Sequence, residues 1–256
     1  MSMEKRTKIN QLLSEHPKGT VLLSKWLTDH GYSPELQQRY RKSEWLESIG
    51  RGAMKRFGEK VTYEGALYGL QTQADSSIHP GGKSALELLG KAHYLKHSNA
   101  PKTLFGTNGE NLPAWFKGYD WGMTVRYYSP SFLPEDIGIT TIDIQELKLR
   151  VSSAERAIME CLYLSPDTQD LLECYQLMEG LNNLRPTIIQ ELLEACKSVK
   201  VKRLFLFMAE KAGHQWFRYL KPEKISLGTG KRSIVKNGAF IAEYGITVPK
   251  ELRDYE

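Results

Sequence analysis

The segment from residue 21 to residue 42 constrains the fold more than any other part of this 256-residue chain. It reads VLLSKWLTDHGYSPELQQRYRK, and its first half repeats apolar residues at helical spacing, which predicts a helix that begins after Thr20. Gly31 is placed to end this helix, and Ser33 with Pro34 is placed to start another. Two short helices joined by so tight a glycine turn are typical of a helix-turn-helix.

The second helix of this pair has the side chains that a major-groove helix needs. Leu36 and Tyr40 are expected to face the core, which leaves a polar face outward. Glutamine offers a donor and an acceptor to adenine, arginine offers a fork to guanine, and lysine offers charge to phosphate. The residues predicted to contact DNA from this helix are Ser33, Gln37, Gln38, Arg41 and Lys42.

Helical and hairpin patterns flank this pair. Residues 4–15 form an amphipathic helix pattern before it, and WLESIGRGAMKRFGEKV after it predicts a hairpin that turns at Gly50–Gly52. The hairpin is expected to act as a wing that contacts the phosphate backbone or the minor groove of DNA. Its predicted contact residues are Arg51, Lys55 and Arg56. The order of helix, helix, polar helix and basic hairpin predicts a winged helix-turn-helix.

The distribution of charge agrees with a nucleic-acid partner for the amino-terminal part. Residues 1–60 contain 12 Lys and Arg against 7 Asp and Glu, whereas residues 61–256 contain 23 of each. All of the net charge of +5 therefore lies in the first 60 residues. Neutralising phosphates releases their counterions and supplies most non-specific affinity for nucleic acid.

The remainder of the chain predicts helices, then strands, then helices again. Two helical patterns follow the wing, up to a polar linker at residues 96–102. TLFG, AWFKG, MTVRYYS and LKLRV read as strands, and four helices follow over 152–164, 167–182, 186–198 and 200–212, the first with Ser152 and Glu155 as its capping pair. Strands in ISL, SIV and AFIAEYGITV close the chain. The expected fold class is α+β, with a winged-helix domain over residues 1–95 and a larger mixed domain over residues 103–256.

A catalytic or metal site is not predicted. HPGGKSALELLG approaches a phosphate-loop motif, but Ser77 stands where its first glycine belongs. The histidines show no ligand spacing, no GxSxG elbow occurs, and Cys161, Cys174 and Cys196 are expected to be buried thiols. We therefore expect no catalytic residues, no metal and no cofactor.

Composition places the chain among ordinary globular proteins. It has 41% hydrophobic and 25% charged residues, and its opening MSMEKRTKINQLL lacks the long apolar run of a signal peptide or spanning helix. The expectation is a cytoplasmic protein with no membrane partner.

Several long blocks resemble one known family, the AbiEi antitoxins of bacterial abortive-infection toxin-antitoxin systems. The resemblance rests on the winged-helix layout, on IHPGGKSALELLGKAHYL and SSAERAIMECLYL, and on LNNLRPTIIQELLEACKSVKVKRLFLFMAEKAGHQWF, LGTGKRSIV and YGITVP. It implies a repressor of its own operon that binds double-stranded DNA at promoter inverted repeats. It also implies a carboxy-terminal antitoxin domain that neutralises a nucleotidyltransferase-like toxin without a stable complex, as in type IV systems involved in phage defence.

The resemblance also suggests which residues act in each role. DNA recognition and wing contacts fall on the residues already named, and the antitoxic surface falls on Lys200, Lys202, Arg203, Lys231 and Arg232. Two alternatives stay open at this point: a winged helix that binds proteins rather than DNA, and an enzyme that acts on nucleotides or RNA through the loop at residues 228–232.

Overall fold

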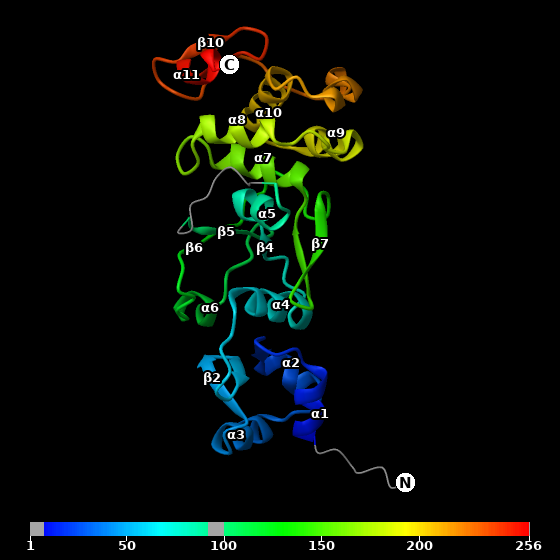
Figure 1. The fold of residues 1–256 in the computed structure, drawn as a ribbon, viewed down its shortest axis with the longest axis vertical. Helices are drawn as coiled ribbons and strands as arrows, with labels where there is room; N and C mark the ends of the chain where they lie inside the picture. The colour runs from blue at the N-terminus through cyan, green and yellow to red at the C-terminus, as the bar shows by residue number, and fades with distance from the viewer. Residues whose placement is uncertain (1–7, 92–99, 256) are drawn as a thin grey trace.

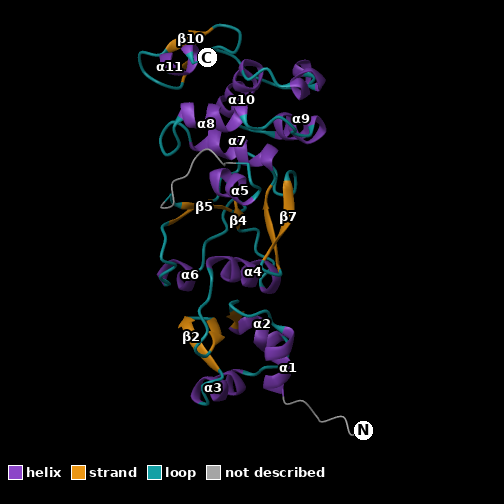
Figure 2. Ribbon diagram, in the orientation of Figure 1, coloured by secondary structure: helices purple, strands orange, loops and turns teal. Residues whose placement is uncertain are grey.

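The computed structural model describes residues 8–91 and 100–255. Its elements stack along one long axis in three layers, with the winged helix at one end and the last strands at the other (Figure 1). Small sheets alternate with short helices along this axis (Figure 2), in agreement with the predicted α+β class.

The first layer is a winged helix-turn-helix. Apolar residues of its three helices and its sheet form one small core around Leu12, Leu27, Tyr40 and Leu46. Its three-stranded sheet has the order β1-β3-β2. The elements are α1 (Lys8–Glu15), β1 (Leu22–Leu23), α2 (Ser24–Asp29), α3 (Pro34–Lys42), β2 (Leu46–Gly50) and β3 (Ala53–Arg56).

The predicted start of the second helix was wrong. Leu22 and Leu23 form β1, because Leu22 pairs with Met54 of β3, and the helix begins only at Ser24. The hydroxyl of Thr20 donates to the carbonyl of Pro17 instead of capping a helix. A strand of two residues cannot show a period of its own, so the sequence pattern extends the neighbouring helix over this apolar run.

The middle layer combines residues from both sides of the expected boundary near residue 100. His79 of β4 pairs with Phe105 of β5 in the sheet β4-β5-β6, and Leu67 shares a core with Leu104 and Phe116. Residues on both sides of residue 100 therefore share a core and a sheet, and most of the predicted linker lies outside the described residues. The elements are α4 (Tyr63–Gln73), β4 (His79–Pro80), α5 (Gly82–Leu88), β5 (Lys102–Phe105), α6 (Ala114–Gly118), β6 (Val125–Tyr128), β7 (Ile139–Ile144) and β8 (Leu147–Ser152).

The segment AWFKG, predicted as a strand, is the helix α6. Pro113 precedes its first turn, and both Trp115 and Phe116 are buried against the middle layer. Two adjacent aromatic residues in a five-residue element fit a strand as well as a helix by pattern alone, so tertiary packing decided the outcome.

The third layer contains the four predicted helices in an apolar core. Cys161, Cys174 and Cys196 are buried thiols within this core, as expected. Residues 225–227, predicted as a strand, are irregular, whereas the later strands form the sheet β10-β11-β9. The elements are α7 (Ala154–Leu164), α8 (Leu171–Glu179), α9 (Pro186–Ala195), α10 (Val199–Lys211), η1 (Gln215–Tyr219), η2 (Pro222–Lys224), β9 (Arg232–Ser233), β10 (Ala239–Ile241), β11 (Ile246–Val248) and α11 (Lys250–Asp254).

Candidate nucleic-acid interface

The turn between α2 and α3 forms as the sequence predicts. Gly31 has a φ of 83°, which is the left-handed conformation that favours glycine. The hydroxyl of Ser33 accepts the N–H of Leu36 at 3.3 Å, and Pro34 begins α3. The cap and the glycine together fix where α3 leaves the turn.

Gln37 is an internal residue and is not available to DNA in this geometry. Its side chain is buried, and its amide group donates to the carbonyls of Ser24 and Tyr32 and to the hydroxyl of Thr28 at 2.8 to 3.1 Å. The prediction that Gln37 reads a base is therefore corrected. The amide group holds α3 at its angle to α2, because it bonds to α2 and to the turn simultaneously.

The outer face of α3 carries the other predicted residues. Gln38, Arg41 and Lys42 are exposed, and Arg41 reaches toward the hairpin with a guanidinium nitrogen 3.4 Å from the sulfur of Met54. Arg39 is exposed as well and adds a cation that the sequence interpretation missed. Arg39 lies beside Tyr40 at the edge of the polar face, and the sequence pattern there does not distinguish a DNA-binding side chain from one that only contacts solvent.

The three wing residues divide between the tip of the hairpin and its base. Arg51 is exposed in the turn between β2 and β3. Lys55 instead binds the side chain of Glu47 and the carbonyl of Glu59, both at 2.6 Å. The expectation that Lys55 lies on phosphate is corrected because its ammonium group is already paired.

Arg56 is likewise a structural residue. Its guanidinium donates to the carbonyls of Leu13 and His16 at the end of α1, and its side chain is only 15% exposed. Burial, together with the charge of Arg56, lowers the pKa of His16 to about 4. Arg56 therefore joins the hairpin to α1, and its predicted contact with DNA is corrected.

The predicted antitoxic cations divide in the same way. The ammonium group of Lys200 donates to the carbonyls of Tyr163 and Ser165, and Lys202 and Arg203 are buried. These three residues are bound within the protein, which corrects their assignment to a surface. Lys231 and Arg232 are exposed. Arg232 begins β9, whose sheet includes β10 at the end of the molecule opposite α3 (Figure 1).

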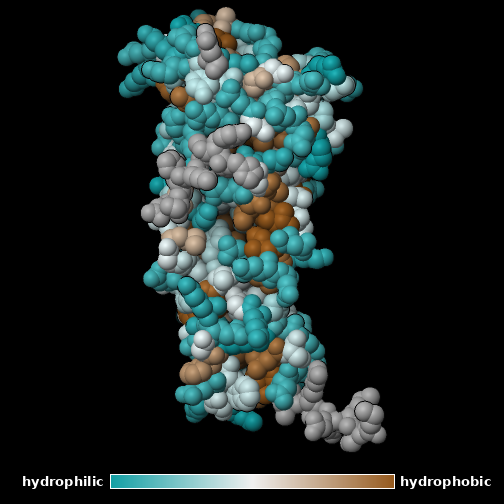
Figure 3. Space-filling model, in the orientation of Figure 1, coloured by the Kyte–Doolittle hydropathy of each residue, from teal (hydrophilic) through white to brown (hydrophobic). Residues whose placement is uncertain are grey.

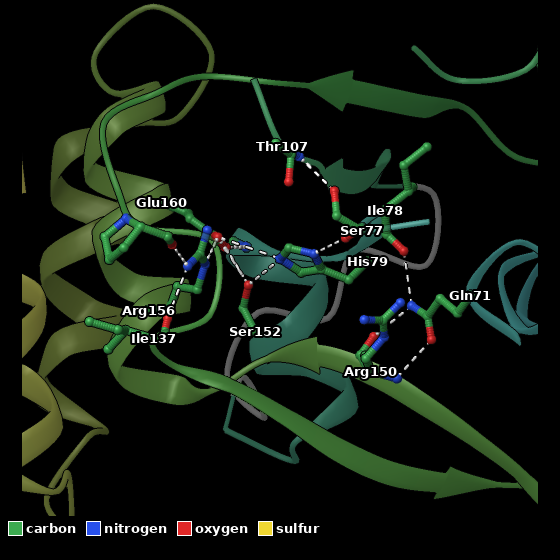
Figure 4. A network of polar contacts seen from close by, with 12 residues as sticks. Gln71, Ser77, Ile78, His79, Thr107, Ile137, Arg150, Ser152, Arg156 and Glu160 are labelled. Carbon is green, nitrogen blue, oxygen red and sulfur yellow. Dashed lines mark hydrogen bonds and ion pairs between the residues drawn. The ribbon is translucent and has the colours of Figure 1, made fainter. Parts of the chain in front are cut away.

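A buried polar cluster links the middle and third layers (Figure 4). The carboxylate of Glu160 accepts from the backbone N–H of Gly82, from the hydroxyl of Ser152 and from Nε of Arg156 at 2.8 to 3.0 Å. Burial raises the pKa of Glu160, but the contacts with His79 and Arg156 outweigh burial and lower it overall. Ser152, expected to cap α7, is committed to this carboxylate.

The cluster has the residue types of a nucleophilic site but not its arrangement. Nδ1 of His79 lies 2.6 Å from the carbonyl of Ser77, and Nε2 lies 3.1 Å from the hydroxyl of Ser152, which is fully buried. The carboxylate of Glu160 contacts the serine rather than the far nitrogen of the imidazole, so the order of a triad is absent from this cluster. In the segment that resembles a phosphate loop, the groups that would bind a phosphate are already paired within the protein. The N–H of Gly82 donates to Glu160, and Lys83 pairs with Glu173 at 2.5 Å.

Among the residues that the structure describes, no group of three or more His, Cys, Asp or Glu is placed to hold a metal ion. In the same residues no helix is long and apolar enough to cross a membrane.

Two family models match the chain. One, for the AbiEi antitoxin N-terminal domain of transcriptional regulators, matches residues 5–97, and the other, for the AbiEi antitoxin of type IV toxin-antitoxin systems, matches residues 101–249. The chain belongs to the AbiEi family of antitoxin transcriptional regulators. The resemblance seen in the sequence is thereby confirmed, and the family is not a known family of enzymes.

A solved structure supports the fold of this AbiEi chain. The Rv2827c protein from Mycobacterium tuberculosis is similar with a TM-score of 0.60 at 13% sequence identity, over 93% of this chain and 88% of that chain. Likeness at this identity concerns the fold alone. A comparison with curated proteins finds no match.

The geometry leaves a smaller candidate interface in this AbiEi protein than the sequence predicts. The exposed members on α3 are Gln38, Arg39, Arg41 and Lys42, with Arg51 at the hairpin tip. Ser33 caps α3 and lies at its exposed start.

Proposed function

We propose that this AbiEi chain represses its own operon by binding inverted repeats in the promoter, with α3 in the major groove. The observation that carries the proposal is the exposed face of α3, where Gln38, Arg41 and Lys42 lie side by side and the guanidinium of Arg41 leans toward the hairpin. A recognition helix needs such a face, because base edges are read by side chains that the fold leaves free.

The proposed contacts separate into two kinds. Gln38, Arg39 and Arg41 would read base edges, since glutamine and arginine can bond a base in two places. Lys42 and Arg51 would bind phosphates and set the register of the helix in the groove. Gln37 and Arg56 would act only by holding α3 and the hairpin in place.

We also propose that the third layer neutralises a nucleotidyltransferase-like toxin. Lys231 and Arg232 remain as the exposed cations of the predicted antitoxic surface. The sheet that contains Arg232 lies far from α3 along the long axis, as the position of its strand β10 shows (Figure 1). In the face drawn in Figure 3 this end of the molecule is largely hydrophilic. Separate ends would let DNA binding and antitoxic action proceed without competition for one surface.

A salt-titrated gel shift on the upstream DNA, beside a scrambled duplex, tests the repressor. Arg41→Ala is expected to weaken specific binding by about 1–3 kcal/mol and to relax base preference. Arg51→Ala is expected to weaken both duplexes and to reduce the salt slope by about 1. Lys117→Ala, an exposed cation of α6, is the control and leaves binding unchanged.

Equal affinity of the wild-type protein for the upstream and scrambled duplexes would contradict sequence-specific recognition. The winged helix would then be assigned to protein interaction.

A further inference from the structure

Residues 226–231 form a loop, the glycine loop, whose backbone is hydrogen-bonded to two buried cations on its inner side. Lys202 and Arg203 of α10 are each 5% exposed, and they donate into the loop at 2.7 to 3.1 Å. The accepting carbonyls are those of Ser226, to Lys202, and of Leu227, Gly228 and Gly230, to Arg203. Four carbonyl groups of the glycine loop are therefore turned toward the protein interior.

This arrangement fixes the direction of the neighbouring N–H groups. In a planar trans peptide the C=O and the following N–H point in opposite directions. Each carbonyl drawn toward Lys202 or Arg203 therefore directs the next N–H away from α10. The N–H groups directed outward in this way belong to Leu227, Gly228, Thr229 and Lys231.

The outward N–H groups have no acceptor within the described part of the chain. Across residues 8–91 and 100–255, no carbonyl or side chain accepts a hydrogen bond from the backbone N–H of residues 226–231. Residues 228–233 are exposed, and Gly228 and Gly230 have φ of 63° and 75°. Successive N–H groups around residues of left-handed conformation form concave anion sites in proteins.

The charge around the glycine loop is positive. Lys231 ends the loop and Arg232 follows it, while residues 224–242 contain no Asp or Glu. Lys231 lies over the ring of Phe240, 4.9 Å from its centre, and neither Lys231 nor Arg232 forms an ion pair with a described residue. An anion bound by the N–H groups would gain both charges.

We propose that the glycine loop binds a phosphate group, carried by a nucleotide or by RNA. Several backbone N–H donors without a protein acceptor, followed in the chain by the guanidinium of Arg232, suit a tetrahedral oxyanion with many acceptor sites, and glycine allows the group to approach the backbone closely. The link to the toxin rests on the proposed antitoxic role of this end: the antitoxin would contact a phosphate-bearing substrate of the nucleotidyltransferase. Phosphate binding itself is a property of the chain alone.

Amide-resolved NMR of the full chain tests this inference with three probes: inorganic phosphate, ATP and a short single-stranded RNA. Downfield shifts of the amides of Leu227, Gly228, Thr229 and Lys231 are the expected result. Shifts with ATP exceeding those with RNA identify a nucleotide as the source, and the reverse order identifies RNA.

Two matched double variants separate a built site from general attraction. Lys231→Ala with Arg232→Ala is expected to weaken phosphate binding at the loop about tenfold or more. Lys224→Ala with Lys236→Ala removes the same charge from the same segment and is expected to leave binding nearly unchanged.

Two results would overturn the inference: no loop shift with any of the three probes, or equal weakening of phosphate binding by both double variants. Shifts confined to the amides of α3 when RNA is added would also count as the absence of a loop shift. Rescue of cells from the toxin is measured separately and tests the antitoxic role. If rescue does not depend on this end of the molecule, the phosphate site is still supported by the NMR shifts. If the loop amides do not shift, the phosphate site is rejected and the antitoxic role is not.

Discussion

At the scale of single residues, hydrogen-bond partners decide which polar side chains remain free. Gln37 and Gln38 are neighbours of the same type on one helix, yet one is buried and the other exposed. The sequence could predict the helix and its polar face from spacing. It could not predict that the Gln37 amide bonds to Ser24, because that contact depends on how α3 crosses α2.

The two glutamines give a direct stability test. Gln37→Ala leaves the carbonyls of Ser24 and Tyr32 without these donors, so we expect it to lower the free energy of unfolding by about 1–3 kcal/mol. Gln38→Ala should leave stability unchanged and alter DNA binding instead. Urea denaturation and a gel shift on both variants measure the two effects. A stable Gln37→Ala protein with altered base preference would place Gln37 on DNA.

His16 makes the stability of the first layer depend on pH. Burial and then Arg56 lower the pKa of His16 from 6.5 to about 4, and the side-chain amide of Gln73 lies 3.1 Å from its Nε2. Between these two values the unfolded chain binds more protons than the folded chain, so stability falls as pH falls from 6.5 toward 4.

Urea unfolding at pH 7 and pH 5 measures this effect. We expect His16→Gln to lose less stability than the wild type between the two conditions. His30→Gln, a change at an exposed histidine, is the control and should behave as the wild type does. An equal loss in His16→Gln and the wild type would show that another group is responsible.

At the scale of elements, the long periodic helices were predictable and the short elements were not. The helices α7 to α10 follow apolar spacing over nine residues or more, whereas β1 and α6 are too short to show a period. Lys202 and Arg203 belong to a basic stripe that could also have been solvated. Their capture by carbonyls of the glycine loop, more than twenty residues away, leaves no trace in local sequence.

The contact of the turn before α5 with α7 gives a test at this scale. A Cβ at Gly81 would lie 2.5 Å from the carboxylate of Glu160 and 2.5 Å from the ring of Phe105. We therefore expect Gly81→Ala to destabilise the protein by about 1–3 kcal/mol, because a packed interior tolerates added volume poorly. Gly118→Ala is the control, since a Cβ there meets nothing within 4 Å. Thermal unfolding of both variants measures the difference, and equal stability would mean that this junction can relax.

At the scale of the whole molecule, the chain is a stack in which each layer shares its core with the next. The domain boundary expected from the sequence is based on a polar stretch near residue 100. The sequence pattern does not show which distant segments pack into the same core. Val21 of the first layer shares a buried core with Leu67 and Val151 of the middle layer, although Val151 is distant from Val21 in the sequence.

The shared core predicts how a truncated chain behaves. A fragment of residues 1–95 would expose Ile78, Ala85 and Leu86, which are buried in the complete structure. We expect this fragment to lack a fixed tertiary structure in its last third, seen as poor dispersion of amide resonances there. A fragment with native-like shifts throughout would show that the middle layer divides into independent parts.

The central claim is that DNA binding and antitoxic action lie at opposite ends of this stack, and a crossed separation-of-function measurement tests it most directly. Arg41→Ala with Lys42→Ala and Lys231→Ala with Arg232→Ala would each be assayed for binding to the upstream DNA and for rescue of growth from the cognate toxin. We expect the first pair to lose DNA binding and keep rescue, and the second pair to keep DNA binding and lose rescue. Loss of both activities in either pair, with the fold intact, would contradict the central claim.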